Sequence, residues 1–582
     1  MFYRGNDNYL MDRREIAQVL DDMAVIFELT DENPFKIRAY QNAARVVEGM
    51  SDLEERIASG SLTEVPGIGK NLADHITELY KTGKIKEHER LRKSIPPGVI
   101  DMLSIQGLGP KRVKIIYKEL KATDIGQLEL LCRVGAIRTR KHFGPKIEEN
   151  ILQGISYLRR HLGEHLSSNA LAAAVEIFEK VKRHPPVKRA EIAGSIRRRK
   201  ELVKDIDIVA SSDAPKKVMD FFTGLPEVEK VEAKGETKSN VILKSGISAD
   251  LRVVSDKEFP YALHHFTGSK EHNIAMRGRA QKMGMKMNEY GLFSVRGKQE
   301  KIIPCKDETE IFARLGLEYI EPELREDMGE IAAAENGTLP KLVTEKDVKG
   351  IIHVHSNYSD GINTIEELAR YSQKLGYSYL GICDHSQSAG YAGGLKPAEV
   401  KKQWEEINEV NKKLKGFTVL KGIEVDILTN GSLDYNDELL EGFDLVIASV
   451  HSKFNMTEEE MTSRLIKAIS HPNVDILGHP TGRLLLSREA YKVDMHKVID
   501  AAAKYNVAIE INANPHRLDL DWRLCPYAHS KGVKIAVCPD AHTTDNIHDI
   551  FFGVGIARKG WLTKEDVVNA WPVEEFIRWL KK

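Results

Sequence analysis

The chain has 582 residues, of which 42% are hydrophobic and 29% charged, and its formal net charge at pH 7 is −1. Such a length exceeds one hydrophobic core, so we expect three to five domains of a soluble, globular protein. A membrane protein is excluded because no run of about 18 apolar residues occurs. The N-terminus lacks the apolar stretch of a signal peptide, which predicts a cytoplasmic location. The five scattered cysteines form no CxxC pair, which argues against a disulfide framework and a thiolate zinc site.

Helical periodicity dominates residues 11–80. One glycine turn lies within this region, and a similar one lies after it. The turns lie in VPGIGKNLADHI (65–76) and IQGLGPKRVKII (105–116), and a degraded third copy is expected in CRVGAIRTRKHFG. Glycine permits positive φ, and the amides that begin the next helix can hold a phosphate. The predicted DNA-binding residues are Gly67, Gly69, Gly107 and Gly109.

Positive charge accompanies these turns. Residues 84–200 contain 26 Lys/Arg against 12 Asp/Glu, which favours a polyanionic partner. The alternatives are a solvated basic surface and ordinary helix–turn–helix connections. Together, charge and turns predict helix-hairpin-helix elements that bind the DNA backbone without reading its sequence.

From about residue 190 the periodicity becomes strand-like, and carboxylates gather in AGSIRRRKELVKDIDIVA (193–210). Asp205 and Asp207 are two apart on one strand and therefore share a face. Asp250, on a later strand, supplies a third carboxylate. Such a triad can hold two Mg²⁺ ions that activate a hydroxyl and stabilise pyrophosphate. The alternative is an edge strand with aspartates facing solvent.

These motifs resemble the family X DNA polymerases, and the resemblance covers residues 1 to about 319. It extends to a thumb-like segment HFTGSKEHNIAMRGRA (265–280) and a strand MNEYGLF (287–293). The resemblance implies that Asp205, Asp207 and Asp250 are the catalytic metal ligands. It also implies that Ser195 and Arg198 bind the triphosphate and that Phe266 and Gly268 border the sugar. By the same resemblance, Asn273 contacts the incoming base and Arg277 the template.

Two positions depart from that family pattern. His265 stands where the vertebrate relative has tyrosine, so the resemblance does not determine how strongly deoxyribose is selected over ribose. His75 falls where lyase members place their Schiff-base lysine. Because a lyase needs a nucleophilic amine, we do not expect that activity.

After an acidic segment expected to be a linker (320–345), short apolar runs alternate with helical stretches, which predicts a βα-repeat barrel. Histidines and carboxylates follow nearly every run, where a parallel barrel displays its active-site groups. Mixed imidazole and carboxylate ligands suit Zn²⁺ or Mn²⁺, and so many candidates imply two or three ions. The candidates are His353, His355, Asp360, His385, Glu424, His451, His479, Asp540 and His542.

This ordered set resembles the polymerase-and-histidinol-phosphatase (PHP) domain, which implies a distorted (βα)7 barrel with a trinuclear metal site. The fold class expected is therefore multidomain α+β and α/β: a helical helix-hairpin-helix region, a nucleotidyltransferase palm and thumb, and a C-terminal PHP barrel. The expected boundaries are 1–82 for an N-terminal helical domain, 83–158 for a fingers-like domain, 159–260 for the palm, 261–319 for the thumb, 320–345 for the linker and 346–582 for the PHP domain.

Both halves resemble bacterial and archaeal family X polymerases with a PHP domain. This resemblance implies a monomeric DNA-repair enzyme, of the base-excision kind, that fills short gaps in nicked or gapped duplexes with dNTPs. The PHP domain implies metal-dependent 3′–5′ exonuclease activity, with abasic-site endonuclease or 3′-phosphatase activity as further options. The competing hypotheses are a template-independent nucleotidyltransferase joined to a small-molecule phosphatase, and a DNA-binding scaffold with inactive sites.

Overall fold

The computed structural model describes residues 11, 13–50, 52–105, 107–297 and 299–581, and most of the N-terminal stretch used to predict the location lies outside them. The chain divides into two compact units, within residues 1–162 and 163–582. Among the described residues, no helix is both long and apolar enough to cross a membrane. All five cysteines are buried and free.

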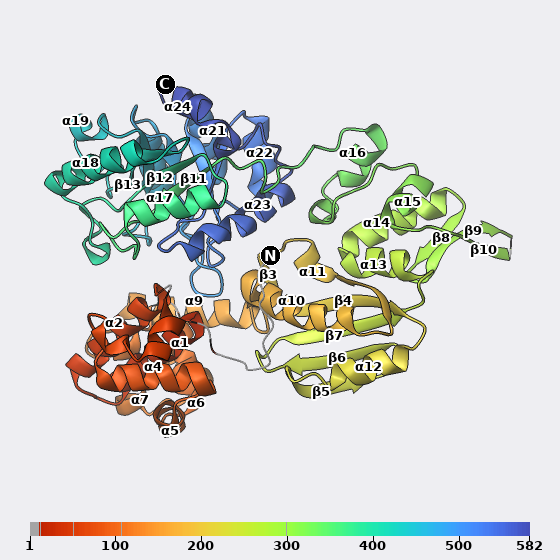
Figure 1. Cartoon of the computed structure of the whole chain (residues 1–582), viewed down its shortest axis with the longest axis horizontal. Helices are drawn as coiled ribbons and strands as arrows, with labels where there is room; N and C mark the ends of the chain where they lie inside the picture. Colours follow the sequence, from red (N-terminus) through yellow and green to blue (C-terminus); the bar gives the residue numbers. More distant parts are fainter. Residues whose placement is uncertain (1–10, 12, 51, 106, 298, 582) are drawn as a thin grey trace. The chain divides into compact units, whose positions relative to one another are not determined.

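The first unit is helical and holds two hydrophobic cores. Helix α1 contributes to both, because Ile16 and Leu20 pack in one core while Ile26 and Leu29 pack in the other. Apolar residues at helical spacing therefore join the N-terminal helices to those that follow. The elements, red to orange in Figure 1, are α1 (Arg13–Leu29), α2 (Pro34–Glu48), α3 (Leu53–Ser59), α4 (Lys70–Thr82), α5 (Lys86–Ser94), α6 (Pro97–Asp101), α7 (Pro110–Leu120), α8 (Ile125–Arg133) and α9 (Pro145–Arg160).

The second unit begins with a five-stranded sheet in the order β2-β4-β7-β6-β5. Strand β4 is flanked by β2, which is antiparallel to it, and by β7, which is parallel. Alternating apolar residues such as Ile206 and Ile208 face a core covered by α10 and α12, so the intervening aspartates face the other way. The bounds are α10 (Ser167–Arg183), β2 (Val187–Ile192), α11 (Gly194–Arg197), β4 (Asp205–Ser212), α12 (Pro215–Thr223), β5 (Val228–Lys234), β6 (Lys238–Leu243) and β7 (Ser248–Val254).

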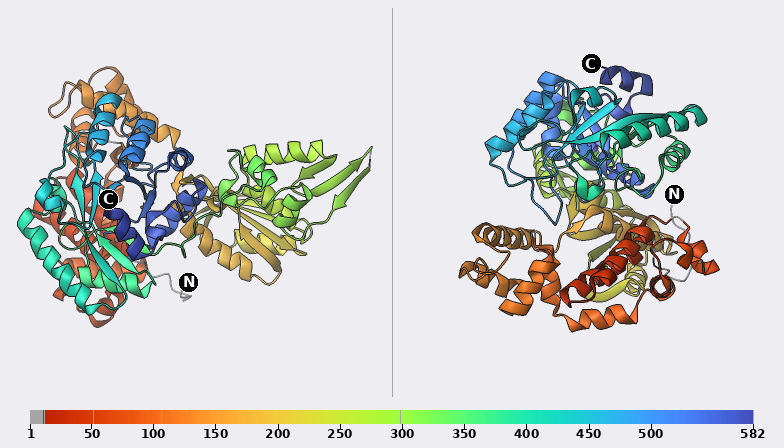
Figure 2. Two further views of the ribbon diagram at one scale, coloured as in Figure 1. Left: turned by 90° about the horizontal axis from the view of Figure 1, so that it is seen from above. Right: turned by 90° about the vertical axis from the view of Figure 1, so that its left-hand side faces the viewer.

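The predicted thumb follows as three helices and a small antiparallel sheet. The hairpin of β9 and β10 projects from these helices (Figure 2). The segment expected to be a linker is folded, since Ile320 and Leu324 join the thumb core and Arg325 is fully buried against Glu308. The bounds are α13 (Phe259–Thr267), α14 (Lys270–Lys282), β8 (Met285–Asn288), β9 (Gly291–Arg296), β10 (Gln299–Ile303), α15 (Glu308–Arg314) and α16 (Glu330–Asn336).

Parallel strands β11 to β17 follow one another in a seven-stranded barrel-like sheet. A bridge between Val354 and Ala541 brings its first and last strands together, so the sheet is nearly closed. Helices α17, α18 and α23 pack against its outer side (Figure 1). The expected fold class is confirmed. The bounds are β11 (Gly350–Val354), α17 (Ile365–Lys374), β12 (Tyr379–Ile382), α18 (Pro397–Lys413), β13 (Thr418–Asp426), β14 (Leu445–Ser449), α20 (Glu458–Ile469), β15 (Ile476–Leu477), α21 (Met495–Tyr505), β16 (Ala508–Asn512), β17 (Ile535–Cys538) and α23 (Ile550–Lys559).

Candidate active sites and DNA interface

The three aspartates predicted for nucleotidyl transfer lie on two neighbouring strands. Asp205 and Asp207 belong to β4, and the parallel register places Asp250 of β7 opposite Asp207. Burial, together with the charges of Asp205 and Asp250, raises the pKa of Asp207 to about 7. A site that raises a carboxylate pKa in this way concentrates negative charge, and this fits a divalent cation.

Neighbouring groups shape this carboxylate cluster. Lys238 Nζ lies 2.9 Å from Asp250 Oδ2 and partly balances the charge. Gly194 has φ +61°, and a Cβ there would lie 2.1 Å from Asp207 Oδ2, so the turn before β4 requires glycine. As these residues are placed in the described chain, the carboxylate oxygens of the three aspartates do not all lie within 4.8 Å of one another. Carboxylates that repel one another are expected to stay apart until a cation joins them.

Arg198, predicted to bind the triphosphate, lies beside the glycine predicted to border the sugar. A Cβ on Gly268 would lie 2.9 Å from Arg198 Nη1. Arg198 Nε donates to Glu326 Oε1 at 3.0 Å, and the buried ammonium of Lys559 pairs with the same carboxylate. The guanidinium is therefore already bound by an anionic group of the chain itself.

The other predicted nucleotide contacts gather near the same strands. Phe266 lines a small depression together with Asp207 and Asp250, which places its ring beside the carboxylates. Asn273 Nδ2 donates to the carbonyl of His265 at 2.7 Å, and Arg277 Nε donates to the carbonyl of Asn273 at 3.1 Å. Ser195 lies in α11, in the glycine turn itself. The roles of all these residues stay predictions.

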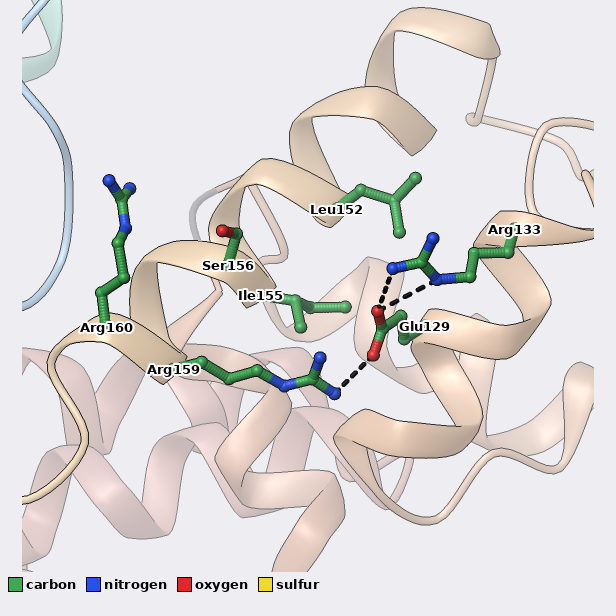
Figure 3. A pocket seen from close by; sticks show the side chains of 7 residues that line it. All are labelled: Glu129, Arg133, Leu152, Ile155, Ser156, Arg159 and Arg160. Atoms are coloured by element: carbon green, nitrogen blue, oxygen red, sulfur yellow. Dashed lines mark hydrogen bonds and ion pairs between the residues drawn. The ribbon is translucent and has the colours of Figure 1, made fainter.

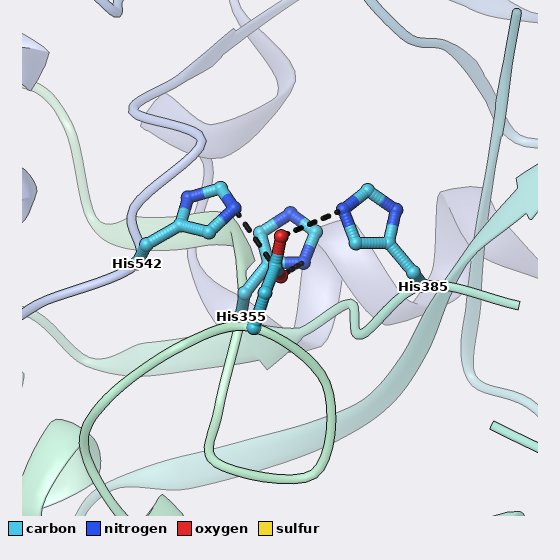
Figure 4. A group of neighbouring side chains, drawn as sticks. His355, His385 and His542 are labelled. Carbon is cyan, nitrogen blue, oxygen red and sulfur yellow. Dashed lines mark ion pairs between the residues drawn. The ribbon is translucent and has the colours of Figure 1, made fainter. Parts of the chain in front are cut away.

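The nine candidate ligands of the barrel converge at the carboxyl ends of its strands. Eight fall into three overlapping groups whose ligand atoms lie within 4.8 Å of one another, and the ninth, His479, has its Nε2 2.9 Å from Glu424 Oε1. His355 and His385 are each shared between two groups, and Figure 4 shows His385 and His542 on either side of His355. The groups are His355, Asp360, His385 and His542; His353, His355 and Asp540; and His385, Glu424 and His451.

The residues of this cluster fit metal ions by three physical criteria. Two buried imidazole nitrogens, His353 Nε2 and His355 Nδ1, have no hydrogen-bond partner among the described residues, which is costly unless an ion binds them. Burial and the neighbouring His542 and His385 lower the pKa of His355 to about 3, so its imidazole is neutral as a ligand must be. His353 and Asp540 hold positive φ of 62° and 52°, a strained conformation typical of functional sites.

Two further carboxylates orient the histidines of the cluster. His353 Nδ1 is bound to Glu510, which also accepts from the backbone amide of His479. His451 Nδ1 is bound to Asp426 in the same way. Such partners fix the ring orientation and leave the second nitrogen for the metal. Neither carboxylate was predicted from the sequence, although both stand in buried strands of the barrel.

Two arginines in the loops of the barrel make different contacts. Arg483, in the motif GHPTGR that carries His479, donates to the carbonyl of Arg517 at 2.9 Å and pairs with Asp521 at 3.0 Å, so it supports the backbone. Arg517 is the arginine near the cluster, with Nε 3.5 Å from Asp540 Oδ2. No sequence motif predicts a role for Arg517, because only the fold of its loop brings it close to Asp540.

Three turns in the helical unit share one backbone arrangement. Gly67 and Gly107 have φ of 90° and 84°, and His142 takes the equivalent position in the third copy with φ 69°. Two residues later a glycine caps the next helix in each case: Gly69 before α4, Gly109 before α7 and Gly144 before α9. The degraded third copy therefore keeps the turn although it has lost the first glycine.

A surface pocket of about 350 Å³ lies between α8 and α9. As Figure 3 shows, Glu129 sits between Arg133 and Arg159 and pairs with both, while Arg160 lies further along α9. The carboxylate thus offsets part of the positive charge of this basic region. Removing Glu129 would leave two guanidinium groups for a phosphate.

Comparison with known proteins agrees with this arrangement. Three family models match: the helix-hairpin-helix domain over residues 11–85, the DNA polymerase beta thumb over 262–326 and the PHP domain over 352–514. A relative from Bacillus subtilis, DNA polymerase/3′-5′ exonuclease PolX, is 38% identical over 98% of this chain and 100% of its own length.

The C-terminal part alone is similar to smaller proteins. A probable phosphatase of Thermoanaerobacter sp. is 29% identical over 40% of this chain and 94% of its own length. Another, of Clostridium acetobutylicum, is 31% identical over 34% of this chain and 80% of its own length. The chain belongs to the family X DNA polymerases of the PolX type, which carry a C-terminal PHP domain.

Proposed function

We propose that this protein fills short gaps in DNA by template-directed synthesis and trims 3′ ends by hydrolysis in its barrel. The observation that supports the proposal is the presence, in one chain, of two separate clusters of side chains suited to bind cations. One is centred on the register pair of Asp207 and Asp250, and the other on Glu424. The full-length similarity to the polymerase and exonuclease from Bacillus subtilis supports the same pairing of activities.

The palm would bind the primer end and a dNTP. Asp205, Asp207 and Asp250 would hold two Mg²⁺ ions, which activate the primer hydroxyl and stabilise the pyrophosphate. Arg198 and Ser195 would bind the triphosphate, and Arg198 must then exchange Glu326 for phosphate oxygens. Phe266 and Gly268 would border the sugar, while Asn273 and Arg277 would contact the base pair.

The barrel would position a phosphodiester for attack by water. Its nine ligands would hold up to three Zn²⁺ or Mn²⁺ ions, which supply hydroxide near neutral pH. Glu510 and Asp426 keep the imidazoles of His353 and His451 in place. Arg517, beside Asp540, is placed to bind a non-bridging phosphate oxygen. The similarity to probable phosphatases favours removal of 3′-phosphates as a second reaction of this site.

Other properties belong to the same proposal. An enzyme that repairs DNA acts where that DNA lies, so the chain would be cytoplasmic, and it would act as a monomer. His75 is bound to Tyr40 at 2.9 Å and carries no amine, so we propose no lyase step there.

A gapped duplex tests the proposal directly. A DNA with a one-nucleotide gap and a 5′-phosphate should be extended by one residue with Mg²⁺ and dNTPs, and its primer shortened with Mn²⁺ and no dNTPs. Product sizes on a sequencing gel separate the two reactions. Addition that ignores the template base would favour the template-independent alternative, and neither reaction would favour an inactive scaffold.

The hairpin turns are predicted to bind the DNA backbone. Alanine at both Gly69 and Gly109 should preserve the fold, because a Cβ at either position meets no atom within 4 Å and neither residue has positive φ. The added methyl groups would hinder the approach of phosphates to the amides of α4 and α7. We expect duplex binding, measured by fluorescence anisotropy, to weaken about 3- to 10-fold. Unchanged affinity with an unchanged melting temperature would assign the turns a purely structural role.

A further inference from the structure

Tyr391 combines high exposure with closeness to the metal-type cluster. Its side chain is 74% exposed, among the highest values for large apolar residues in the described chain. Yet its ring centroid lies 6.3 Å from that of His385 and 6.5 Å from that of His451. An aromatic ring left open to solvent beside an active site is unusual, because burying it would stabilise the fold.

The loop that carries Tyr391 is firmly anchored. The amide of Ser388 and the hydroxyl of Ser386 both donate to Asp434 Oδ2, at 2.8 and 2.9 Å. The amide of Leu395 returns to the carbonyl of His385 at 2.9 Å, which ties the end of the loop to a predicted ligand. A Cβ on Gly394 would lie 1.9 Å from the carbonyl oxygen of Ser386, so the close turn requires glycine. The exposed ring is thus presented by a loop of defined shape.

No hydrogen bond of the Tyr391 hydroxyl accounts for the exposed position of the side chain in the described structure. Among the described residues no hydrogen bond of that hydroxyl is found, so the residue contributes chiefly an open aromatic face. Arg517 supplies positive charge at another side of the cluster, next to Asp540. A ligand suited to these surroundings has an anionic phosphate for the cluster and Arg517, and a flat apolar group for Tyr391.

A nucleotide has both parts. We propose that Tyr391 stacks on the base of the 3′-terminal nucleotide while the phosphodiester of that nucleotide lies on the cluster. Stacking on an aromatic ring tolerates every base, because each base has a π-face. Tyr391 is then a specificity residue that favours nucleic-acid ends over small phosphate esters. This inference rests on the proposed 3′-trimming activity and names its substrate class.

The first test measures stacking without cleavage. A primer ending in 2-aminopurine, with a phosphorothioate at the terminal linkage, is added to the metal-loaded full-length protein. Base stacking quenches 2-aminopurine fluorescence, so the wild type and Tyr391→Phe should quench it, and Tyr391→Ala should lose at least half of the quenching. Equal quenching by all three proteins overturns the proposal.

The second test measures trimming of normal primers. Tyr391→Ala should raise KM about 5- to 100-fold with little change in kcat, whereas Tyr391→Phe should keep the KM of the wild type. On a primer whose last nucleotide is abasic, all variants should have equal KM. An equal loss on both primers would indicate a structural role and overturn the proposal.

A matched control is Leu375→Ala. Leu375 is also an exposed apolar residue of the barrel, at 37%, but it follows α17, at the end of the barrel opposite to the cluster. It should change neither measurement. If the wild type trims no primer, the proposed function fails, and the quenching measurement still decides the role of Tyr391.

Discussion

Replacing Asp205 and Asp207 together by asparagine should lower nucleotide addition to a gapped primer by at least about 1000-fold and leave 3′ trimming unchanged. Both residues share a face of β4, and Asp207 lies opposite Asp250, so the double variant removes two of three predicted ligands. Bound metal contributes several kcal/mol of transition-state stabilisation in reactions of this kind. Single-turnover addition of one dNTP measures the first effect, and primer shortening measures the second.

Asp213→Asn is the matched control for this experiment. Asp213 follows β4 directly but is exposed and pairs with Lys188, so its replacement should leave both reactions unchanged. Retained nucleotide addition in the double variant would contradict the palm assignment. Loss of both reactions would argue against two separate sites.

The single variant Asp207→Asn should stabilise the metal-free protein. Burial and the neighbouring carboxylates raise the pKa of Asp207 to about 7. The Asp207 carboxyl therefore lowers the free energy of unfolding by an amount that grows as the pH rises from about 4 to 7. The gain in unfolding free energy should therefore be larger at pH 8 than at pH 5, by an amount on the order of 1–2 kcal/mol. Urea unfolding in the presence of a chelator measures it. An equal gain at both pH values would show that the carboxylate is not crowded.

Glu424→Gln should have the converse effect on the two reactions. The Glu424 carboxylate lies within 4 Å of five imidazoles. Burial raises its pKa, but His451, His385 and His353 outweigh burial and hold the pKa well below the ordinary value. An amide in its place binds metal weakly and removes one negative charge from the cluster. We expect 3′ trimming to fall at least about 1000-fold and the content of bound transition metal to fall with it.

Metal analysis of the purified variant and primer shortening with Mn²⁺ check this expectation, and gap filling shows whether the rest of the chain is intact. Asp437→Asn serves as the control, because Asp437 also pairs with a barrel histidine, His471, but is exposed. If burial of the amide unfolds the barrel, Asp360→Asn tests the same cluster, because Asp360 is an exposed member of it. A variant that keeps both its metal and its trimming activity would contradict the assignment.

The sequence predicts best what local periodicity and strand direction determine. Asp205 and Asp207 share a face because strands alternate, and histidines that follow successive apolar runs meet because parallel strands end at one edge. The residues it missed depend on tertiary contacts. Glu510 and Asp426 are recognised as supports only when His353 and His451 are seen beside them.

Other differences have similar causes. The segment 320–345 has an acidic composition typical of a linker, yet pairs such as Arg325 with Glu308 let it pack. His142 keeps the turn of a hairpin whose glycine has been replaced, which composition alone does not reveal.

Every strand of the barrel contributes to its cluster. The ends of β11, β12, β13, β14, β15 and β17 carry the predicted ligands, and β16 carries the supporting Glu510. No subset of neighbouring strands therefore carries the complete cluster. A PHP domain shortened by any one strand would lose a predicted ligand, or the supporting Glu510, along with a piece of its core.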